Sequence, residues 1–232
     1  MSSILPKDSP KNAAIYHVDR EHGNLRLVIL LAFIGLWVVI GLIAGAIFSS
    51  DGLNLLAILI GFFGAYGLSE LINRRLKTSW RSGRVIEVAS DAVRVIKHGV
   101  NESELHAGQP VTPLFWRFEV RKRARIPKGW WMYALGLEGD NAVITAYTFL
   151  SPKEAEAYTP TPEFKLLEGK KKKSGKQQHP IMETTLRAAG EERRLRAAEE
   201  FRWVSGAEMT DDDFIRFVEQ IKAEFPEWAP FS

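Results

Sequence analysis

Residues 27–48 read LVILLAFIGLWVVIGLIAGAIF and contain no charged side chain. With a rise of about 1.5 Å per residue, a helix of this length crosses the hydrocarbon core of a bilayer. A second apolar run, residues 53–68, reads LNLLAILIGFFGAYGL and follows after only a short turn, residues 49–52. The two runs therefore predict an antiparallel transmembrane hairpin. A buried hairpin in a soluble protein is the weaker alternative, because two such runs are rare in a chain of 232 residues.

The cations near this hairpin lie at its two outer ends. The turn carries only Asp51, whereas cations precede the first run and follow the second: Arg20, Arg26, Arg74, Arg75, Lys77, Arg81 and Arg84. The positive-inside rule then places both termini in the cytosol and predicts a multi-pass protein of the cell membrane. Glu70 and Arg74 are four residues apart, so we expect them to pair at the membrane interface.

Small residues recur at every fourth position of both runs. Gly41 and Gly45 mark the first run, and Ala57, Gly61 and Ala65 mark the second. Small side chains let helix backbones approach closely in lipid. Packing of the two helices against each other needs at least one such stripe, so we favour it over the alternative, contact between copies in a homo-oligomer.

The composition of the chain limits its chemistry. It contains no cysteine, which excludes disulfides, thiolate catalysis and cysteine-ligated metal sites. The hydrophobic share is 46%, yet the mean hydropathy is -0.12, as expected when apolar residues are concentrated in one segment. The formal net charge of +3 is too small to indicate nucleic acid by itself.

The sequence divides into segments on either side of the hairpin. Residues 1–24 form a cytosolic N-terminal segment, 25–73 the hairpin, 80–158 an antiparallel β meander, 159–182 a basic flexible loop, and 183–232 C-terminal helices that pack on the sheet. The predicted fold class is a membrane protein with a two-helix transmembrane hairpin and an α+β cytosolic domain. Its strands form an antiparallel sheet or a small barrel, closed by a C-terminal amphipathic helix.

Alternation and turn residues predict the strands of the meander. Residues 84–89 and 92–98 flank a turn at Ser90-Asp91, and residues 130–138 and 142–150 flank a turn at Gly139-Asp140-Asn141. Residues 114–126 alternate apolar and charged side chains and predict a further strand. Residues 101–113 are polar and interrupted by glycine and proline, so we expect a loop there.

Helix signals dominate the C-terminal part. Ser151 caps a short helical turn, residues 183–203 are rich in Ala, Arg and Glu, and Thr210 caps a last helix that ends at Pro226. The last helix gathers its apolar residues on one face, which should pack on the sheet: Phe214, Phe217, Val218, Ile221 and Phe225. Residues 159–182 combine prolines with a lysine run, which is typical of a flexible loop.

A basic face on the strand predicted at residues 114–126 is the main candidate binding site. Its members are Arg117, Arg121, Lys122, Arg123, Arg125 and Lys128. Near the inner leaflet, such a surface attracts anionic lipid headgroups by about 1 kcal/mol per cation. A solvated face without a binding role is the commoner meaning of a charge run. Stacking of nucleic acid on the neighbouring tryptophans ranks below lipid.

No catalytic motif is present in the sequence. The histidines lack the spacing of metal ligands, and there is no phosphate-binding glycine loop, nucleophile elbow or HExxH sequence. Asp211, Asp212 and Asp213 form the first turn of a predicted helix, where acidic residues stabilise the positive end of the helix dipole. We therefore expect no cofactor, no metal and no enzymatic activity.

The order of elements resembles that of bacterial membrane-anchored pleckstrin-homology-like proteins. The likeness is carried by the strand–turn–strand at residues 84–98 (RVIEVASDAVRVIKH) and by the closing helix at residues 209–225 (MTDDDFIRFVEQIKAEF). The resemblance implies a small barrel-like fold, a short strand at residues 13–19 before the anchor, and a binding or scaffold role. Residues 159–203 depart from the family pattern as an insertion.

These observations leave three functions in order of preference. The first is a membrane-anchored, non-enzymatic binding or scaffold module that engages anionic lipid or a protein partner. The second is an accessory or oligomeric subunit of a membrane transport or channel complex, with the small-residue stripes as contact surface. An enzyme of unrecognised type ranks last, because the motifs of known chemistries are missing.

Overall fold

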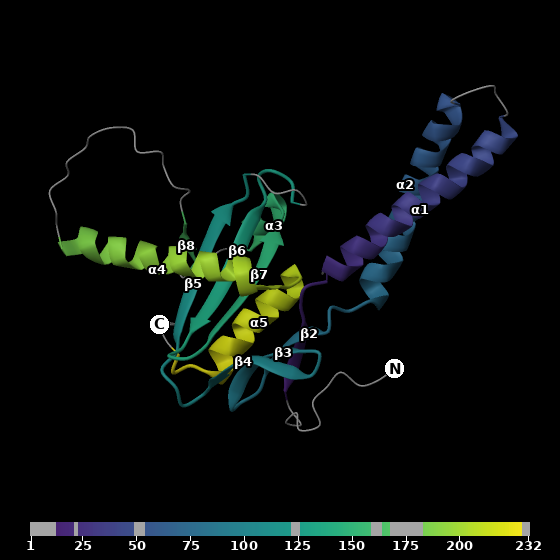
Figure 1. The fold of residues 1–232 in the computed structure, drawn as a ribbon. Helices are drawn as coiled ribbons and strands as arrows, with labels where there is room; N and C mark the ends of the chain where they lie inside the picture. Colours follow the sequence, from purple (N-terminus) through teal and green to yellow (C-terminus); the bar gives the residue numbers. More distant parts are fainter. Residues whose placement is uncertain are drawn as a thin grey trace. The chain divides into compact units, whose positions relative to one another are not determined.

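The structure is a computed structural model that describes residues 13–20, 23–48, 54–121, 126–158, 164–167 and 183–228. The chain divides into two compact units: Asp19–Ser82 forms one, and Met1–Val18 with Gly83–Ser232 forms the other. We call the first unit the helical hairpin and the second the α+β unit. Figure 1 labels the helices and most of the strands.

Helices α1 (Gly23–Ile47) and α2 (Leu55–Ser79) make up the helical hairpin and cover nearly all of both predicted apolar runs. They meet at small residues, because a side-chain carbon added at Gly61 would lie 3.0 Å from Gly41 Cα. Ala57 and Ala65 are buried as well. At Gly45, by contrast, an added carbon would meet no atom within 4 Å. An added carbon at Gly41 would likewise meet no atom within 4 Å, so Gly61 is the glycine that the close approach of α1 and α2 requires among the described residues.

The large apolar side chains of the helical hairpin are mostly exposed. Leu42 is 70% exposed, Leu55 69% and Phe63 66%. Two spans, Asn24–Ile47 and Leu55–Lys77, are long and apolar enough to cross a membrane, and in the first only 6% of the most apolar window is buried. The core helix of a soluble protein would be mostly buried instead. The expected pair of Glu70 with Arg74 is present, with 3.1 Å between Oε1 and Nε.

The helical hairpin is inserted between two paired strands. Strand β1 (Ala14–His17) precedes α1, and strand β2 (Arg84–Val88) follows α2. The two strands pair antiparallel, with His17 opposite Val85. The short strand that the family resemblance implies before the anchor is therefore present. It belongs to the α+β unit, although the whole hairpin separates it in sequence from the other strands.

Strands β3 (Ala92–Lys97) and β4 (Val100–His106) continue the first sheet, whose order is β1-β2-β3-β4. The turn predicted at Ser90-Asp91 is confirmed, because β2 and β3 flank it and pair antiparallel. The loop expected at residues 101–113 is wrong over its first half, which β4 occupies. An edge strand needs few apolar residues, and most side chains of β4 are exposed or half-buried.

The second sheet has the order β8-β5-β6-β7-β9. Its strands are β5 (Thr112–Glu119), β6 (Trp131–Glu138), β7 (Val143–Leu150), β8 (Lys165–Leu166) and β9 (Ala207–Glu208). The three long strands are antiparallel, whereas β8 and β9 pair in parallel with β5 and β7. The sheet is therefore mixed, and not purely antiparallel as expected.

Two predictions need correction: where one strand ends, and whether one segment is a loop throughout. The strand predicted at residues 114–126 ends at Glu119, because its partner β6 begins opposite at Trp131 and the chain turns between them at Gly129, whose φ is 90°. The loop expected at residues 159–182 contains β8, and Phe164 and Leu167 on either side of it are buried. Residues 122–125, 159–163 and 168–182 lie outside the described part of the chain.

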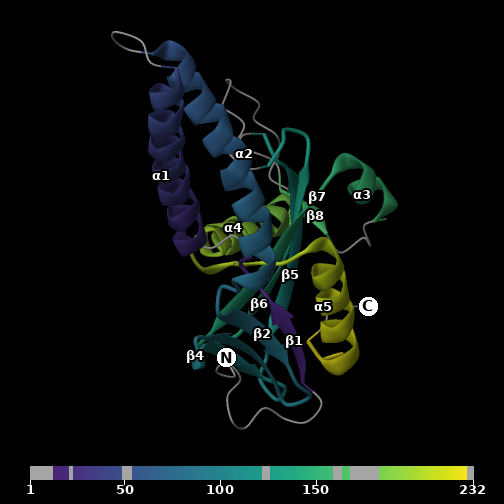
Figure 2. The ribbon, with the colours of Figure 1, turned by 90° about the vertical axis from the view of Figure 1, so that its right-hand side faces the viewer.

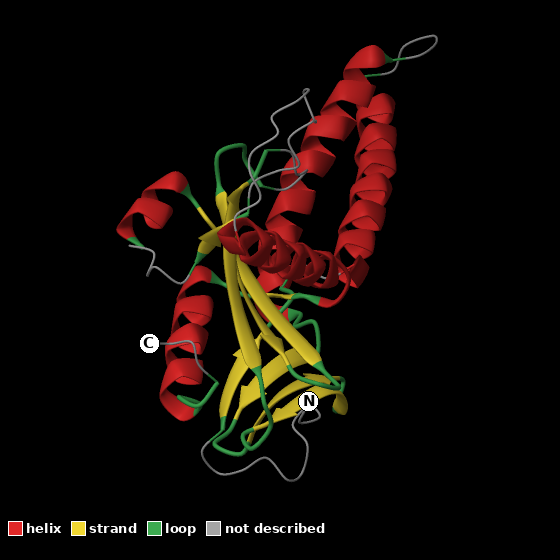
Figure 3. Cartoon of the chain, turned by 90° about the vertical axis from the view of Figure 1, so that its left-hand side faces the viewer, coloured by secondary structure: helices red, strands yellow, loops and turns green. Residues whose placement is uncertain are grey.

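Three helices complete the α+β unit: α3 (Pro152–Ala157), α4 (Glu183–Ser205) and α5 (Asp211–Glu224). Helices α4 and α5 lie on opposite faces of the second sheet, as Figures 2 and 3 show. All three were expected from the sequence. Ser151 forms a capping box with Glu154 at the start of α3, and Thr210 caps α5.

The two faces of the second sheet bury different cores. On one face, Phe214 and Phe217 of α5 pack with Tyr133 and with side chains of the first sheet. On the other face, Leu195 of α4 packs with Trp116. The predicted packing of the last helix on the sheet is thus confirmed. The predicted barrel is wrong, because the described strands form two separate sheets.

Strand β1 is tied to this core by Tyr16. Its hydroxyl donates a 2.6 Å hydrogen bond to Gln220 Oε1 on α5, and its ring contacts Phe217 edge-on at 5.6 Å. Burial raises the pKa of Tyr16 above its ordinary value, because the charged form loses its hydration. A segment that precedes the helical hairpin therefore completes the fold of the unit that follows it.

Candidate functional site

A groove of about 860 Å³ in the α+β unit is lined by both sheets and by α4. Residues 101–104 of β4 form one side, with Arg84 and Lys97 beside them. Residues 141–145, at the start of β7, form the opposite side, and Phe201 and Val204 of α4 form a third wall. Its size falls within the range of clefts that bind ligands.

Strand edges line two sides of this groove. Side chains alternate between the two faces of a strand, so a groove that touches several consecutive residues lies along the strand's edge. Residues 101–104 and 141–145 are two such runs. β4 is the last strand of the first sheet, and β9 pairs with β7 only at Ala146 and Tyr147. Among the described residues, the groove thus runs between two strand edges that no other strand covers.

The two edges converge at one end of the groove. Leu105, which follows the β4 run, packs against Gly139, where an added side-chain carbon would lie only 2.6 Å from Leu105 Cδ2. A larger residue at Gly139 would have to push Leu105 aside. This contact joins β4 to the turn before β7 through side-chain packing, next to the residues that line the groove.

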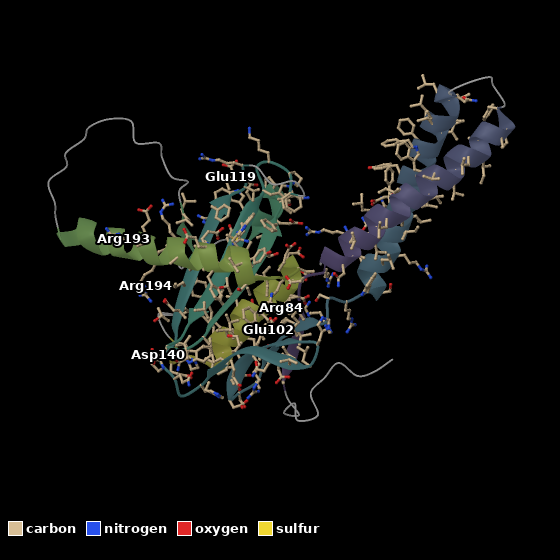
Figure 4. The ribbon with its side chains drawn as sticks, in the orientation of Figure 1. Arg84, Glu102, Glu119, Asp140, Arg193 and Arg194 are labelled. Atoms are coloured by element: carbon tan, nitrogen blue, oxygen red, sulfur yellow. The ribbon has the colours of Figure 1, made fainter. Side chains whose placement is uncertain are left out.

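A β-bulge in β4 aims Glu102 at the cations of the groove. The register between β3 and β4 shifts between Val95 and Ile96, which leaves Glu102 as the extra residue on β4. Its carboxylate lies 2.9 Å from Arg84 Nε and 3.4 Å from Lys97 Nζ. Figure 4 shows Arg84 and Glu102 side by side. The bulge therefore links β4 to the first residue of β2.

Arg84 also binds the C-terminal end of α4, the helix that forms the third wall of the groove. Its guanidinium donates hydrogen bonds to the carbonyl oxygens of Ser205 at 2.8 Å and Gly206 at 3.3 Å. The last carbonyls of a helix carry a partial negative charge, so an arginine there satisfies and stabilises them. Arg84 follows α2 after residues 80–83 only. A residue that lines the groove thus follows the helical hairpin closely in sequence.

Glu104, the second carboxylate of the groove, belongs to an ion-pair network around Arg94. Arg94 Nε lies 2.7 Å from Glu104 Oε1, and its other nitrogens reach Asp91 at 2.7 Å and the buried Glu87 at 3.3 Å. Asn101 donates a further hydrogen bond to Glu104 at 2.8 Å. The hydrogen bond from Arg94 holds the pKa of Asp91 below its ordinary value, because it stabilises the carboxylate. Strands β3 and β4 are thus fixed to each other by charge.

A buried ion pair fixes the end of α4 on the second sheet. Arg202, which is 3% exposed, donates two hydrogen bonds to the Glu199 carboxylate, at 2.8 and 2.6 Å. Glu199 also accepts a 2.9 Å hydrogen bond from the Trp116 indole, and Arg202 lies 4.6 Å from the centre of the Tyr147 ring. The same helix end presents Val204 to the groove, where this valine is 83% exposed.

The basic residues predicted as a lipid site have different surroundings. Arg117 lies over the rings of Trp131 and Tyr133, at 5.3 and 5.9 Å, and donates a 3.2 Å hydrogen bond to the Tyr133 hydroxyl. Arg121 and Lys128 are exposed. Lys122, Arg123 and Arg125 lie outside the described residues. Arg117 is therefore engaged within the sheet. Of the predicted basic face, the structure describes two exposed cations, Arg121 and Lys128.

The groove is not predicted from the sequence, because the polar residues of β4 favour a loop. A signal for β4 was present in His98-Gly99, where His98 has a φ of 50° and Gly99 one of 81°. Two residues with positive φ are typical of the tight turn in a β-hairpin. No local signal predicts that the end of α4 lies against the first sheet. The residues that contact each other there, Arg84 and Gly206, are separated by 122 positions.

Neither a metal cluster nor a relative assigns a chemistry to the groove. In the parts of the chain that the structure describes, no group of three or more His, Asp or Glu side chains could hold a metal ion. Comparison of the chain with family models, with curated proteins and with solved structures gives no match. The geometry of the groove is therefore the basis for a functional proposal.

Proposed function

We propose that the chain is a membrane-anchored, non-enzymatic binding module that takes up a partner in the groove of its α+β unit. The observation that carries this proposal is the groove itself, about 860 Å³ in volume and lined by strand edges, apolar side chains of α4 and paired charges. Both of its carboxylates, Glu102 and Glu104, are bound by arginine. Such a lining suits recognition of a partner better than acid–base chemistry.

The helical hairpin is the anchor in this proposal. Its two helices have the length and apolar surface of membrane spans. The cations at its outer ends favour an orientation with both termini in the cytosol. Pairing of β1 with β2 supports a common side for both ends, because residues 14–17 and 84–88 must reach each other without crossing the bilayer.

The strand order supports a relation to pleckstrin-homology-like domains. A four-stranded antiparallel sheet is followed by the three antiparallel strands β5, β6 and β7, and the amphipathic helix α5 comes last. The unit departs from that plan through α4 and β9, which come between β7 and α5. In our proposal, these additional elements shape the binding site, because α4 forms one of its walls.

Photo-crosslinking from the groove tests this proposal in native membranes. The chain contains no cysteine, so Val204→Cys gives a single attachment point for a photoreactive label in the groove. Lys153→Cys on α3 is the matched control, because Lys153 is exposed but does not line the groove. We expect a discrete adduct from position 204 that is absent from position 153. No adduct, or the same adducts from both positions, would contradict the proposal.

A further inference from the structure

We propose that the partner in the groove is an extended polypeptide segment that pairs with the open edge of β7 as an additional strand. This inference rests on the proposed function and names the class of its ligand. It is carried by the backbone geometry of β7, by the blocked edge of β4 opposite, and by the different chemistry of the two walls.

The backbone of β7 presents hydrogen-bonding groups to the groove. Met209 N–H donates a 2.8 Å hydrogen bond to Tyr147 C=O, so the backbone groups of Tyr147 point to the outer edge of β7. In a strand, the N–H and C=O of alternate residues point to the same edge. Val143 therefore presents both of its groups on that edge, and β9 reaches no further along it than Ala146. Because Val143 lines the groove, a peptide there can form ladder hydrogen bonds.

The edge of β4 across the groove is unsuited to the same pairing. The bulge at Glu102 interrupts its regular register, and bulges and charged side chains are the usual means by which edge strands avoid added strands. Glu102 and Glu104 are fixed there by Arg84 and Arg94. A bound peptide would thus pair along one of its edges only, with β7.

Strand β9 shows that this edge of β7 accepts a parallel segment of chain. Ala207 and Glu208 already pair with Ala146 and Tyr147 in parallel. A peptide bound at Val143 would extend the interface that β9 has begun along the same edge. The open strand edge is therefore continuous with a pairing that the fold already uses.

The walls of the groove specify the side chains of such a peptide. Phe201 and Val204 on the α4 side are apolar, whereas Lys97 and Glu102 on the β3–β4 side are charged. Because side chains alternate between the two faces of a strand, the peptide should alternate apolar and polar residues. An anionic headgroup fits less well, since Glu102 already pairs with both Arg84 and Lys97.

A random nine-residue peptide library displayed on phage tests the inference on the full chain in detergent micelles. We expect enriched sequences with alternating apolar and polar residues. N-methylation of their backbone nitrogens one at a time should weaken binding about tenfold at the position whose N–H pairs with the Val143 carbonyl, and leave the two neighbouring positions unaffected, because their N–H groups point away from β7. Failure to enrich any peptide, or equal sensitivity to N-methylation at neighbouring positions, would overturn the inference.

A proline at Val143 tests the same pairing from the side of the protein. Val143→Pro removes an N–H that points away from β6, so the fold should be retained, while binding of the selected peptide should weaken about tenfold. Val143→Thr keeps the N–H and is the matched control with unchanged binding. Equal binding by both variants would overturn the inference. If Val143→Pro lowers the melting temperature markedly, the N-methylation pattern alone decides. A crosslinked partner at position 204 together with a negative peptide result would leave the proposed function standing and refute the inference.

Discussion

The helical hairpin and the α+β unit arrange their apolar side chains in opposite ways. In the hairpin, the glycines Gly41 and Gly61 meet at the helix contact, while Phe63 is 66% exposed. In the α+β unit, the large side chains are inside, and Trp116 and Phe217 are both 0% exposed. In water, the hydrophobic effect drives large apolar side chains into the core. In lipid this driving force is absent, because the acyl chains are as apolar as the side chains. This contrast is the one expected if lipid surrounds the helical hairpin and water surrounds the α+β unit.

Removing the helical hairpin should have the largest effect, because it removes the part of the chain that is expected to need detergent. We expect that replacing residues 19–82 with a short turn converts a detergent-dependent protein into a soluble, folded one, because His17 and Val85 already face each other in the β1–β2 ladder. Sedimentation and circular dichroism of the shortened chain measure this. A further deletion of residues 1–18 should unfold it, since Tyr16 and β1 would be lost from the core. A shortened chain that still needs detergent would contradict the view that water surrounds the α+β unit.

Truncation of one phenylalanine in each unit should have very different effects. Phe217→Ala leaves a cavity between α5 and the sheets and should lower the free energy of unfolding by about 3–5 kcal/mol. Phe63→Ala removes an exposed side chain from the helical hairpin and should leave the stability of the α+β unit unchanged. Urea unfolding in detergent, followed by tryptophan fluorescence, compares the two. Equal losses would show that the units do not fold independently.

Two ion pairs of α4 offer a finer comparison within the α+β unit. Glu199→Ala leaves the buried Arg202 without its carboxylate and should cost about 2–4 kcal/mol of stability. The control is Glu192→Ala, which breaks the more exposed pair with Arg196 and should cost less than about 1 kcal/mol. Thermal unfolding of both variants measures the difference. A loss for Glu199→Ala no greater than for the control would contradict the role given to this pair.

Acidification should have the smallest effect on the stability of the α+β unit. The pKa of Asp91 is lowered from 3.8 in the folded chain by its hydrogen bond with Arg94, so the stability it adds is present above that pH and is lost as the pH falls through the folded value. Because Asp91 is 59% exposed, we expect a loss below about 1 kcal/mol. Asp91→Asn should flatten the pH dependence of unfolding below about pH 4. An unchanged pH dependence would argue against this contribution.

Much of the fold could be predicted where the signal is local. The helical hairpin, the strands around Ser90-Asp91, and helix α5 each follow from the residues within one segment. Strands β8 and β9 could not be predicted, because two residues in parallel pairing leave no periodic pattern and depend on partners distant in sequence. The groove has no local signal for the same reason, since β4, β7 and α4 form it together.

The basic face shows a different limit of sequence reasoning. Alternation correctly placed Trp116 and Arg117 on opposite faces of β5, but both faces of this sheet are covered. Arg117 therefore stacks on Trp131 instead of facing water. A strand that carries an arginine need not have a solvated face at that position, because an arginine can pack its planar group on aromatic rings.

Accessibility of single cysteines in intact cells tests the membrane anchor most directly. The natural chain offers no background, because it contains no cysteine. With Ser2→Cys, Ser50→Cys and Ser232→Cys examined one at a time, a membrane-impermeant maleimide should label position 50 from outside, and positions 2 and 232 only after lysis. Labelling of position 232 in intact cells, or recovery of the full chain in the aqueous fraction without detergent, would contradict the account.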